Sequence, residues 1–237
     1  MIRDRLRQFA LPFALIAVCV LPSAGRARAD SFDWRNVDGK NYMTPSKPQG
    51  PLECQFFGSI AAFEAKIKIA MDDPDIDIDL SERHVLAANL GTFSLFAGAG
   101  VLTEAEMPYE TVPPVFAPGW EDRTWSITEY QPMGRITDED SQRAAIQGWL
   151  RDYGPLYTQD YHGNTLVGYD DEAAHWIVKE TFGTAYCDNG YGYYDYGYMQ
   201  GRHVVALTGE VRYGRTEFFG PVSVWQGGTG GWGEAGN

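Results

Sequence analysis

Cysteine is scarce in this chain, and its scarcity excludes one class of structure. Only three cysteines occur in 237 residues, and Cys19 lies in an N-terminal segment typical of a secretory leader. The two that remain can form one disulfide at most, which excludes the disulfide framework of many small exported domains. Two alternatives stay open: a single bridge between Cys54 and Cys187, or two free thiols.

Basic residues are also few. The leader holds five Arg and one Asp, which leaves 14 of the 19 basic residues, 31 of the 32 acidic residues and a formal net charge of −17. This balance argues against nucleic acid and anionic membrane surfaces as partners. The sequence contains no phosphate-binding loop, zinc-ligand spacing or dinucleotide fingerprint, so we expect no cofactor and no metal.

Long hydrophobic runs are absent after the leader. Residues 1–29 combine a basic start (Arg3, Arg5, Arg7), an apolar stretch too short to span a bilayer, and the small-residue pattern Ala27-Arg28-Ala29. We therefore predict a signal peptide over 1–29 and an exported protein, secreted or periplasmic, without a membrane anchor. About 208 residues remain, enough for one full domain or two small lobes.

Hydrophobic periodicity divides the rest of the chain into a helical half and a β-rich half. Helices are predicted over 55–71, from Ser81 onward, and over 139–153. Short strands separated by Gly and Asp-Asp turns are predicted at 156–158, 164–169, 176–179, 191–196 and 204–207. This order predicts an α+β fold of two lobes that meet at a cleft.

Cys54 lies where a loop containing Gly50 and Pro51 runs into the first of these helices. A thiol at a helix N-terminus feels the positive end of the helix dipole, which favours the thiolate and hence a nucleophile. The alternative is that Cys54 is a small buried apolar residue.

Three separated segments together resemble the papain-like (cathepsin-type) cysteine peptidases, as a divergent secreted bacterial member. The first is Phe32-Asp33-Trp34-Arg35 followed by Thr44–Gly50, and the second is the helix that Cys54 begins. The third runs from His162 through Asp170-Asp171 to Trp176–Gly183 and Asp188–Tyr191. The resemblance implies a papain-like domain over 30–210, with a helical lobe at about 50–110 and a barrel-like β lobe at about 120–210. Residues 211–237 would be a C-terminal extension, Gly-rich at its end.

The resemblance also implies a site. Cys54 would be the nucleophile, His162 the general base and acid, Glu180 the group that orients the imidazole, and Gln49 a donor to the oxyanion. The implied activity is hydrolysis of peptide or protein substrates; the oligomeric state is left open. His84 and His175 are interpreted as structural.

Several residues depart from the pattern of this family. Pro51-Leu52-Glu53-Cys54-Gln55 replaces C-G-[SA]-C-[WY], in a loop one residue shorter. Glu53 adds a negative charge beside the thiol, which disfavours the thiolate. Glu180 stands where the family has asparagine, and Phe182 replaces the tryptophan that shields it. Two hypotheses therefore remain, a secreted cysteine peptidase and a non-catalytic papain-fold module that binds peptide or serves as part of an extracellular protein.

Overall fold

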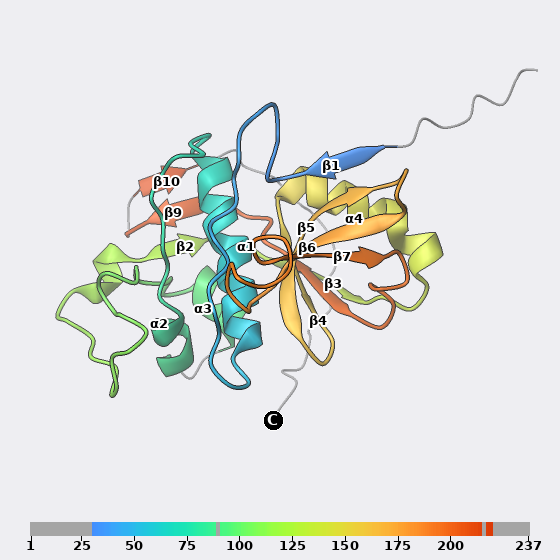
Figure 1. Ribbon diagram of the computed structural model, residues 1–237. Coiled ribbons are helices and arrows are strands. Elements are labelled where there is room, and N and C mark those ends of the chain that lie inside the picture. Colours follow the sequence, from blue (N-terminus) through green and yellow to red (C-terminus); the bar gives the residue numbers. More distant parts are fainter. Residues whose placement is uncertain (1–29, 89–90, 215–216, 220–237) are drawn as a thin grey trace, which may run out of the picture.

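A computed structural model describes residues 30–88, 91–214 and 217–219. The predicted signal peptide and the Gly-rich end of the chain lie outside the described residues. One long helix, α1 (Cys54–Ala70), runs through the middle of the molecule, with smaller helices and a short sheet on one side and a larger sheet on the other (Figure 1).

The central helix α1 is buried on nearly all sides. All residues from Phe57 to Lys68 except Lys66 are buried. Ile60 and Phe63 belong to the core on the helical side, and Ala65 belongs to the core on the β side. A helix that buries side chains in two cores is fixed relative to both, which holds its first residue, Cys54, at a defined place.

The helical lobe combines short helices with a small antiparallel sheet of strand order β10-β9-β2. Its elements are α2 (Glu82–Ala87), α3 (Thr92–Ala97), the 3-10 helix η1 (Trp120–Arg123), β2 (Trp125–Ile127), β9 (Val211–Tyr213) and β10 (Glu217–Phe219). Ser81 caps α2 by accepting a hydrogen bond from the backbone N–H of His84 at 3.0 Å. Its core packs Phe63 of α1 against Phe96 of α3, with ring centroids 4.8 Å apart.

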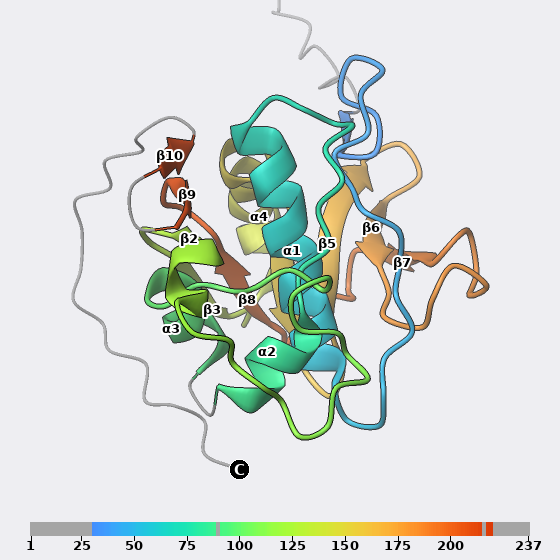
Figure 2. The same cartoon turned by 90° about the vertical axis from the view of Figure 1, so that its left-hand side faces the viewer.

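The β lobe is an antiparallel sheet with strand order β3-β8-β4-β5-β6-β7, and β1 pairs with β5. Its elements are β1 (Ser31–Asp33), β3 (Gln131–Arg135), α4 (Glu139–Tyr153), β4 (Leu156–Gln159), β5 (Gly163–Asp170), β6 (His175–Lys179), β7 (Tyr191–Asp195) and β8 (His203–Ala206). Figure 2, turned by 90°, shows α1 between the helical lobe and this sheet.

The central helix packs closely against the β lobe where α1 meets β5. A Cβ atom on Gly58 would lie 2.9 Å from the Cα atom of Asn164, so only glycine permits this backbone contact. The hydroxyl of Thr165 donates to the carbonyl of Gly58 at 2.7 Å. The start of α1 and the start of β5 are therefore locked side by side.

The predicted helices at 55–71, after Ser81 and over 139–153 are confirmed as α1, α2 and α4, and the five predicted strands are confirmed as β4 to β8. The sequence pattern did not indicate α3, β1, β2 or β3. Strands β9 and β10 fall within the range assigned to the C-terminal extension, yet β9 pairs with β2, so the folded region continues past residue 210. No helix of the described residues is long and apolar enough to cross a membrane.

Candidate active site

Cys54 is the first residue of α1 and is half-buried, with a free thiol. The backbone N–H groups of the first helical turn point toward this end of the helix, and their partial positive charge favours an anion there. Cys187, the other cysteine outside the leader, is exposed and also free. The open question of a bridge is thereby answered in this structure: no disulfide joins the two.

His162 directly precedes β5 and is held from two directions. Its Nε2 atom lies 3.0 Å from Oε2 of Glu180. The imidazole stacks on Phe182, with ring centroids 4.9 Å apart and planes tilted by 5°. The hydroxyl of Thr181 lies 3.4 Å from the same Nε2 atom. Because Nε2 faces a carboxylate, the imidazole carries its proton there when neutral, which leaves Nδ1 as the basic nitrogen.

Glu180 is a buried carboxylate, with 3% of its surface exposed. Burial by itself raises its pKa, but hydrogen bonds from His162 and from the Tyr194 hydroxyl, 2.6 Å from Oε1, outweigh this and hold the pKa below its ordinary value. Glu180 is therefore ionised at neutral pH and can stabilise a positively charged imidazole.

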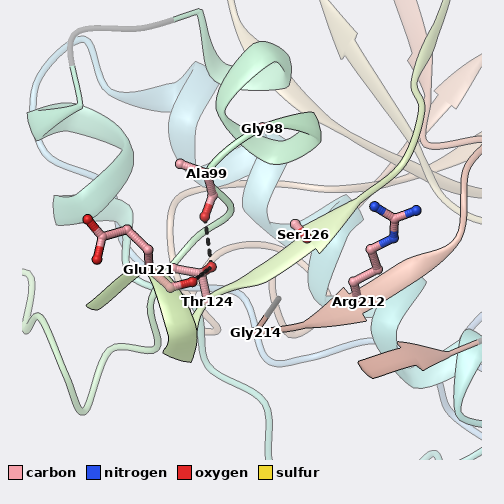
Figure 3. Close-up of a pocket in the computed structure, with 7 residues that line it drawn as sticks. All are labelled: Gly98, Ala99, Glu121, Thr124, Ser126, Arg212 and Gly214. Carbon is pink, nitrogen blue, oxygen red and sulfur yellow. Dashed lines mark hydrogen bonds between the residues drawn. The ribbon is translucent and has the colours of Figure 1, made fainter. Parts of the chain in front are cut away.

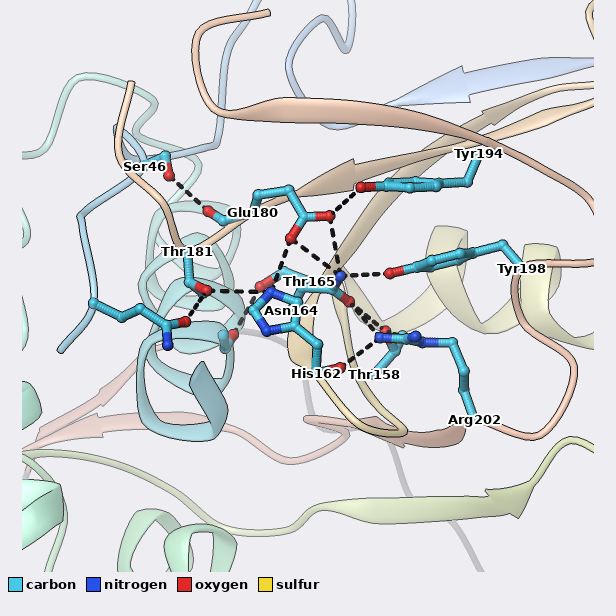
Figure 4. A network of polar contacts seen from close by, with 12 residues as sticks. Ser46, Thr158, His162, Asn164, Thr165, Glu180, Thr181, Tyr194, Tyr198 and Arg202 are labelled. Carbon is cyan, nitrogen blue, oxygen red and sulfur yellow. Dashed lines mark hydrogen bonds and ion pairs between the residues drawn. The ribbon is translucent and has the colours of Figure 1, made fainter. Parts of the chain in front are cut away.

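A buried polar network lies behind Glu180 and His162 (Figure 4). The side-chain amide nitrogen of Asn164 lies 3.3 and 3.4 Å from the two Glu180 oxygens and 2.6 Å from the Tyr198 hydroxyl. Its oxygen accepts hydrogen bonds from Thr158 at 2.7 Å and from Arg202 at 3.2 Å.

Arg202 connects this network to the backbone of the candidate base. Its Nη2 atom donates to the carbonyl of His162 at 2.6 Å, and its guanidinium lies 4.3 Å from the ring centroid of Tyr198. The side chain is buried, so the contacts form in a medium that strengthens them. Sequence reasoning missed this network because its residues are scattered over β4, β5, β7 and the segment before β8.

Gln49 reaches the same group of side chains through Thr181. Its Oε1 atom accepts a hydrogen bond from the Thr181 hydroxyl, and its backbone N–H donates to the Thr181 carbonyl at 2.9 Å. Its Nε2 atom donates to the carbonyl of Gly50 at 3.1 Å. One amide hydrogen is thus directed at the nucleophile loop, and the second is the one that an oxyanion could use.

Cys54 lies beside this group through close backbone packing. A Cβ atom on Gly163 would lie 3.0 Å from the Cα atom of Gln55, so the residue after His162 touches the residue after Cys54. Among the residues that the structure describes, no hydrogen bond joins Cys54 Sγ to the imidazole. The structure thus connects His162, Glu180 and Gln49 by hydrogen bonds, and it sets Cys54 next to them.

The loop before Cys54 has an unusual backbone geometry. Leu52 adopts a left-handed backbone conformation, with φ +63, and its side chain is 93% exposed. Glu53 takes the N-cap position of α1, but its carboxylate accepts a hydrogen bond from the Tyr109 hydroxyl instead of capping the helix.

Other candidate sites carry less chemistry. A cavity of about 350 Å³ lies in the helical lobe (Figure 3), where the Thr124 hydroxyl donates to the carbonyl of Ala99 at 2.7 Å. None of the four predicted site residues lines it. Within the described ranges, no group of three or more His, Cys, Asp or Glu residues could hold a metal ion. His84 is fully buried and accepts a hydrogen bond from Leu102, whereas His175 is half-buried.

Comparison with known proteins agrees with this architecture. No protein-family model matches the chain. A protein of Arabidopsis thaliana named "Probable cysteine protease RDL6" is 25% identical over 206 residues, which cover 72% of this chain and 56% of that protein. The chain thus spans little more than half the length of this curated relative.

Solved structures show the fold. The digestive procathepsin L2 proteinase from Tenebrio molitor larval midgut has a TM-score of 0.59 at 21% identity, covering 73% of this chain and 66% of that one. The cysteine protease and lectin-like domains of Cwp84, a surface layer associated protein of Clostridium difficile, have a TM-score of 0.59 at 17% identity, covering 79% and 53%. These similarities confirm the predicted α+β, papain-like fold.

Proposed function

The chain has the papain-like fold of cysteine proteases, and we propose that it is itself a secreted cysteine peptidase of that kind. The observation that carries the proposal is the buried, ionised Glu180 at 3.0 Å from Nε2 of His162. Burying a carboxylate is costly unless it is fully hydrogen-bonded. This one has a dedicated set of partners, as expected of a group that stabilises an imidazolium.

The proposed reaction is acyl transfer followed by hydrolysis. Nδ1 of His162 takes the thiol proton of Cys54, and the thiolate attacks the carbonyl carbon of a peptide bond. The Cys54 N–H and the second amide hydrogen of Gln49 then stabilise the oxyanion. His162 returns the proton to the leaving amine as the C–N bond breaks, and water later hydrolyses the thioester by the reverse proton path.

The proposed partners follow from this chemistry. The substrate class is a peptide or protein. Export rests on residues 1–29, and the extracellular setting of one neighbour, a bacterial surface layer associated protein, supports it. N-terminal sequencing of the exported chain should begin at Asp30. A chain that keeps its first 29 residues after export would contradict the predicted cleavage.

A second candidate function is a papain-fold module that binds peptide without cleaving it. Two observations favour it: one donor hydrogen of Gln49 is directed at Gly50, and an acidic residue, Glu53, takes the N-cap position directly before Cys54. Such a module would keep the papain-like fold but would lack the thiolate–imidazolium pair.

A peptidyl epoxysuccinate separates the two functions, because it alkylates an activated cysteine in a substrate cleft. We expect one label per chain at Cys54 by mass spectrometry, retained in Cys187→Ser and abolished in His162→Ala. Hydrolysis of a peptide library should disappear with the same variant. A folded sample that takes up no label and cleaves no peptide would rule out the peptidase and leave the binding module.

A further inference from the structure

The N-terminus of α1 has an acidic neighbour that does not do what acidic residues usually do at that position. A negatively charged side chain at a helix N-terminus is ordinarily attracted by the partial positive charge of the N–H groups of the first helical turn. Glu53 makes no side-chain hydrogen bond to them. Its Oε2 atom accepts instead from the hydroxyl of Tyr109, which is 56 residues further along the chain.

The first helical turn retains free donors as a result. The N–H groups of Phe56 and Phe57 donate to the backbone carbonyl of Glu53, at 3.0 and 3.3 Å. In the described part of the chain, the N–H groups of Cys54 and Gln55 donate no hydrogen bond. These two donors lie next to the thiol, and the first is the oxyanion donor of the proposed mechanism.

Tyr109 is itself firmly positioned. Its ring packs edge-on against Phe57, with centroids 5.5 Å apart, and the guanidinium of Arg83 lies 5.0 Å from its centroid. Arg83 Nε also donates to the Tyr109 carbonyl at 2.6 Å. A Cβ atom on Gly50 would lie 2.5 Å from the Tyr109 oxygen, so glycine at that position makes room for the pair.

We propose that Tyr109 is a positioning residue for the nucleophile: it holds the Glu53 carboxylate off the N-terminus of α1, so that this end of the helix serves Cys54 and the oxyanion. The inference rests on the proposed role of Cys54. A released carboxylate would fold back onto the free N–H groups of Cys54 and Gln55. It would then occupy the oxyanion donor and place a like charge beside the thiolate.

Other titratable groups also surround Cys54, but they do not by themselves account for a change at the helix N-terminus when the Tyr109 hydroxyl is removed. On the β side these are Tyr157, which interacts electrostatically with the thiol, His162 with Glu180, and Arg202 behind them. On the helical side, Arg83 stands beneath Tyr109. Glu53 directly precedes α1, so a rotation of its own side chain would bring its carboxylate to the helix N-terminus.

The test is the pH dependence of Cys54 alkylation by iodoacetamide, in a full-length background carrying Cys19→Ser and Cys187→Ser. Tyr109→Phe keeps the ring but removes the hydroxyl. We expect the midpoint of its rate profile to rise by about one pH unit, with alkylation about tenfold slower below the midpoint. Adding Glu53→Gln should bring the profile back to within about twofold of the background.

A matched control is Glu110→Gln, which removes the same charge from the residue beside Tyr109 and should leave the profile unchanged. The proposal is overturned if Tyr109→Phe keeps the background midpoint, or if its shift persists with Glu53→Gln. Should Tyr109→Phe fail to fold, as judged by near-ultraviolet circular dichroism, Glu53→Asp takes its place. This shorter carboxylate cannot reach Tyr109, and an unshifted midpoint would equally overturn the proposal.

The readout also separates this inference from the proposed function. Alkylation reports the thiol whether or not any peptide is cleaved. Absence of epoxysuccinate labelling counts against the peptidase, while the difference between the Tyr109 variants still decides the role of Tyr109.

Discussion

The two walls of the candidate site are built in different ways. His162 and Glu180 on the β side belong to a network of buried side chains on neighbouring strands, and each polar atom of the Glu180 carboxylate has more than one partner. Cys54 on the helical side follows a short loop whose Leu52 is exposed in a left-handed conformation and whose Glu53 depends on one side-chain partner.

This difference shows that the β side of the candidate site is held by more hydrogen bonds than the helical side. A carboxylate in place of the neutral asparagine expected from the resemblance needs additional donors because it is buried and charged, and Asn164 and Tyr194 supply them. The loop before Cys54 has fewer supports. Substitutions in the β-side network of His162 and Glu180 should therefore reduce activity or stability more than substitutions in the loop before Cys54.

The largest effect is expected from Glu180→Gln, which keeps an oxygen near His162 but removes the charge that stabilises the imidazolium. We expect kcat/KM for a fluorogenic peptide at pH 7 to fall about 10³-fold. Glu172→Gln, the same charge change on an exposed turn of the same lobe, should change it less than about twofold. Equal effects of the two variants would refute the special role of Glu180.

Arg202→Met should produce the next largest effect, on stability. It removes the donor to the His162 carbonyl and leaves the Asn164 oxygen with one partner fewer. Losing buried hydrogen bonds from a charged group should lower the free energy of unfolding by about 3 kcal/mol in urea titrations. Arg123→Met, which breaks a partly exposed ion pair with Glu106, should cost less than about 1 kcal/mol. Similar losses would contradict the importance of the network.

His84 makes one contribution to stability in the helical lobe that acid removes. Burial lowers the pKa of this imidazole to about 4. Since the unfolded value is near 6.5, the unfolded chain binds the proton first, and stability present above pH 6.5 is lost as the pH falls toward 4. His84→Asn keeps an acceptor for the Leu102 N–H. Between pH 7 and pH 5, the free energy of unfolding of this variant should fall by about 2 kcal/mol less than that of wild type.

The measurement is the difference between wild type and variant in urea titrations at both pH values. Burial raises the pKa of Glu82 to about 7, which acts in the opposite direction over the same range, but this contribution is common to both proteins and cancels. His175→Asn should leave the pH slope of wild type. An unchanged slope in His84→Asn would show that the imidazole does not carry the effect.

The smallest effect is expected at Leu52. Leu52→Gly relieves a left-handed conformation that costs a side chain about 1–2 kcal/mol, and the greater freedom of glycine in the unfolded chain offsets part of the gain. We expect a net stabilisation of about 0.5 kcal/mol by thermal unfolding. Val115→Gly, at another exposed apolar residue, should be destabilising instead. Destabilisation by both substitutions would mean that the loop is not strained.

Local patterns made much of the fold predictable. The helix period that begins at Cys54, the Ser81 cap and the alternation within 164–169 each depend on neighbouring residues, so sequence alone revealed them. The pairing of β9 with β2 was not predictable in this way, because Trp125 and Tyr213 lie far apart in sequence and both strands have three residues. So short a strand carries too little periodicity to be recognised.

The sequence by itself determined the order of the candidate residues and the departures around them: Gln49, Glu53 before Cys54, and Glu180 after His162. Tertiary structure alone decided what each of them contacts. In the sequence, Asn164 and Arg202 look like ordinary polar residues. In the fold, the start of β5 and the segment before β8 bring their side chains together beneath His162. Likewise, only the packing of the helical lobe brings Tyr109 into contact with Glu53. The physical reason is that the sequence determines the charge of a side chain, whereas contacts between distant segments determine its partner.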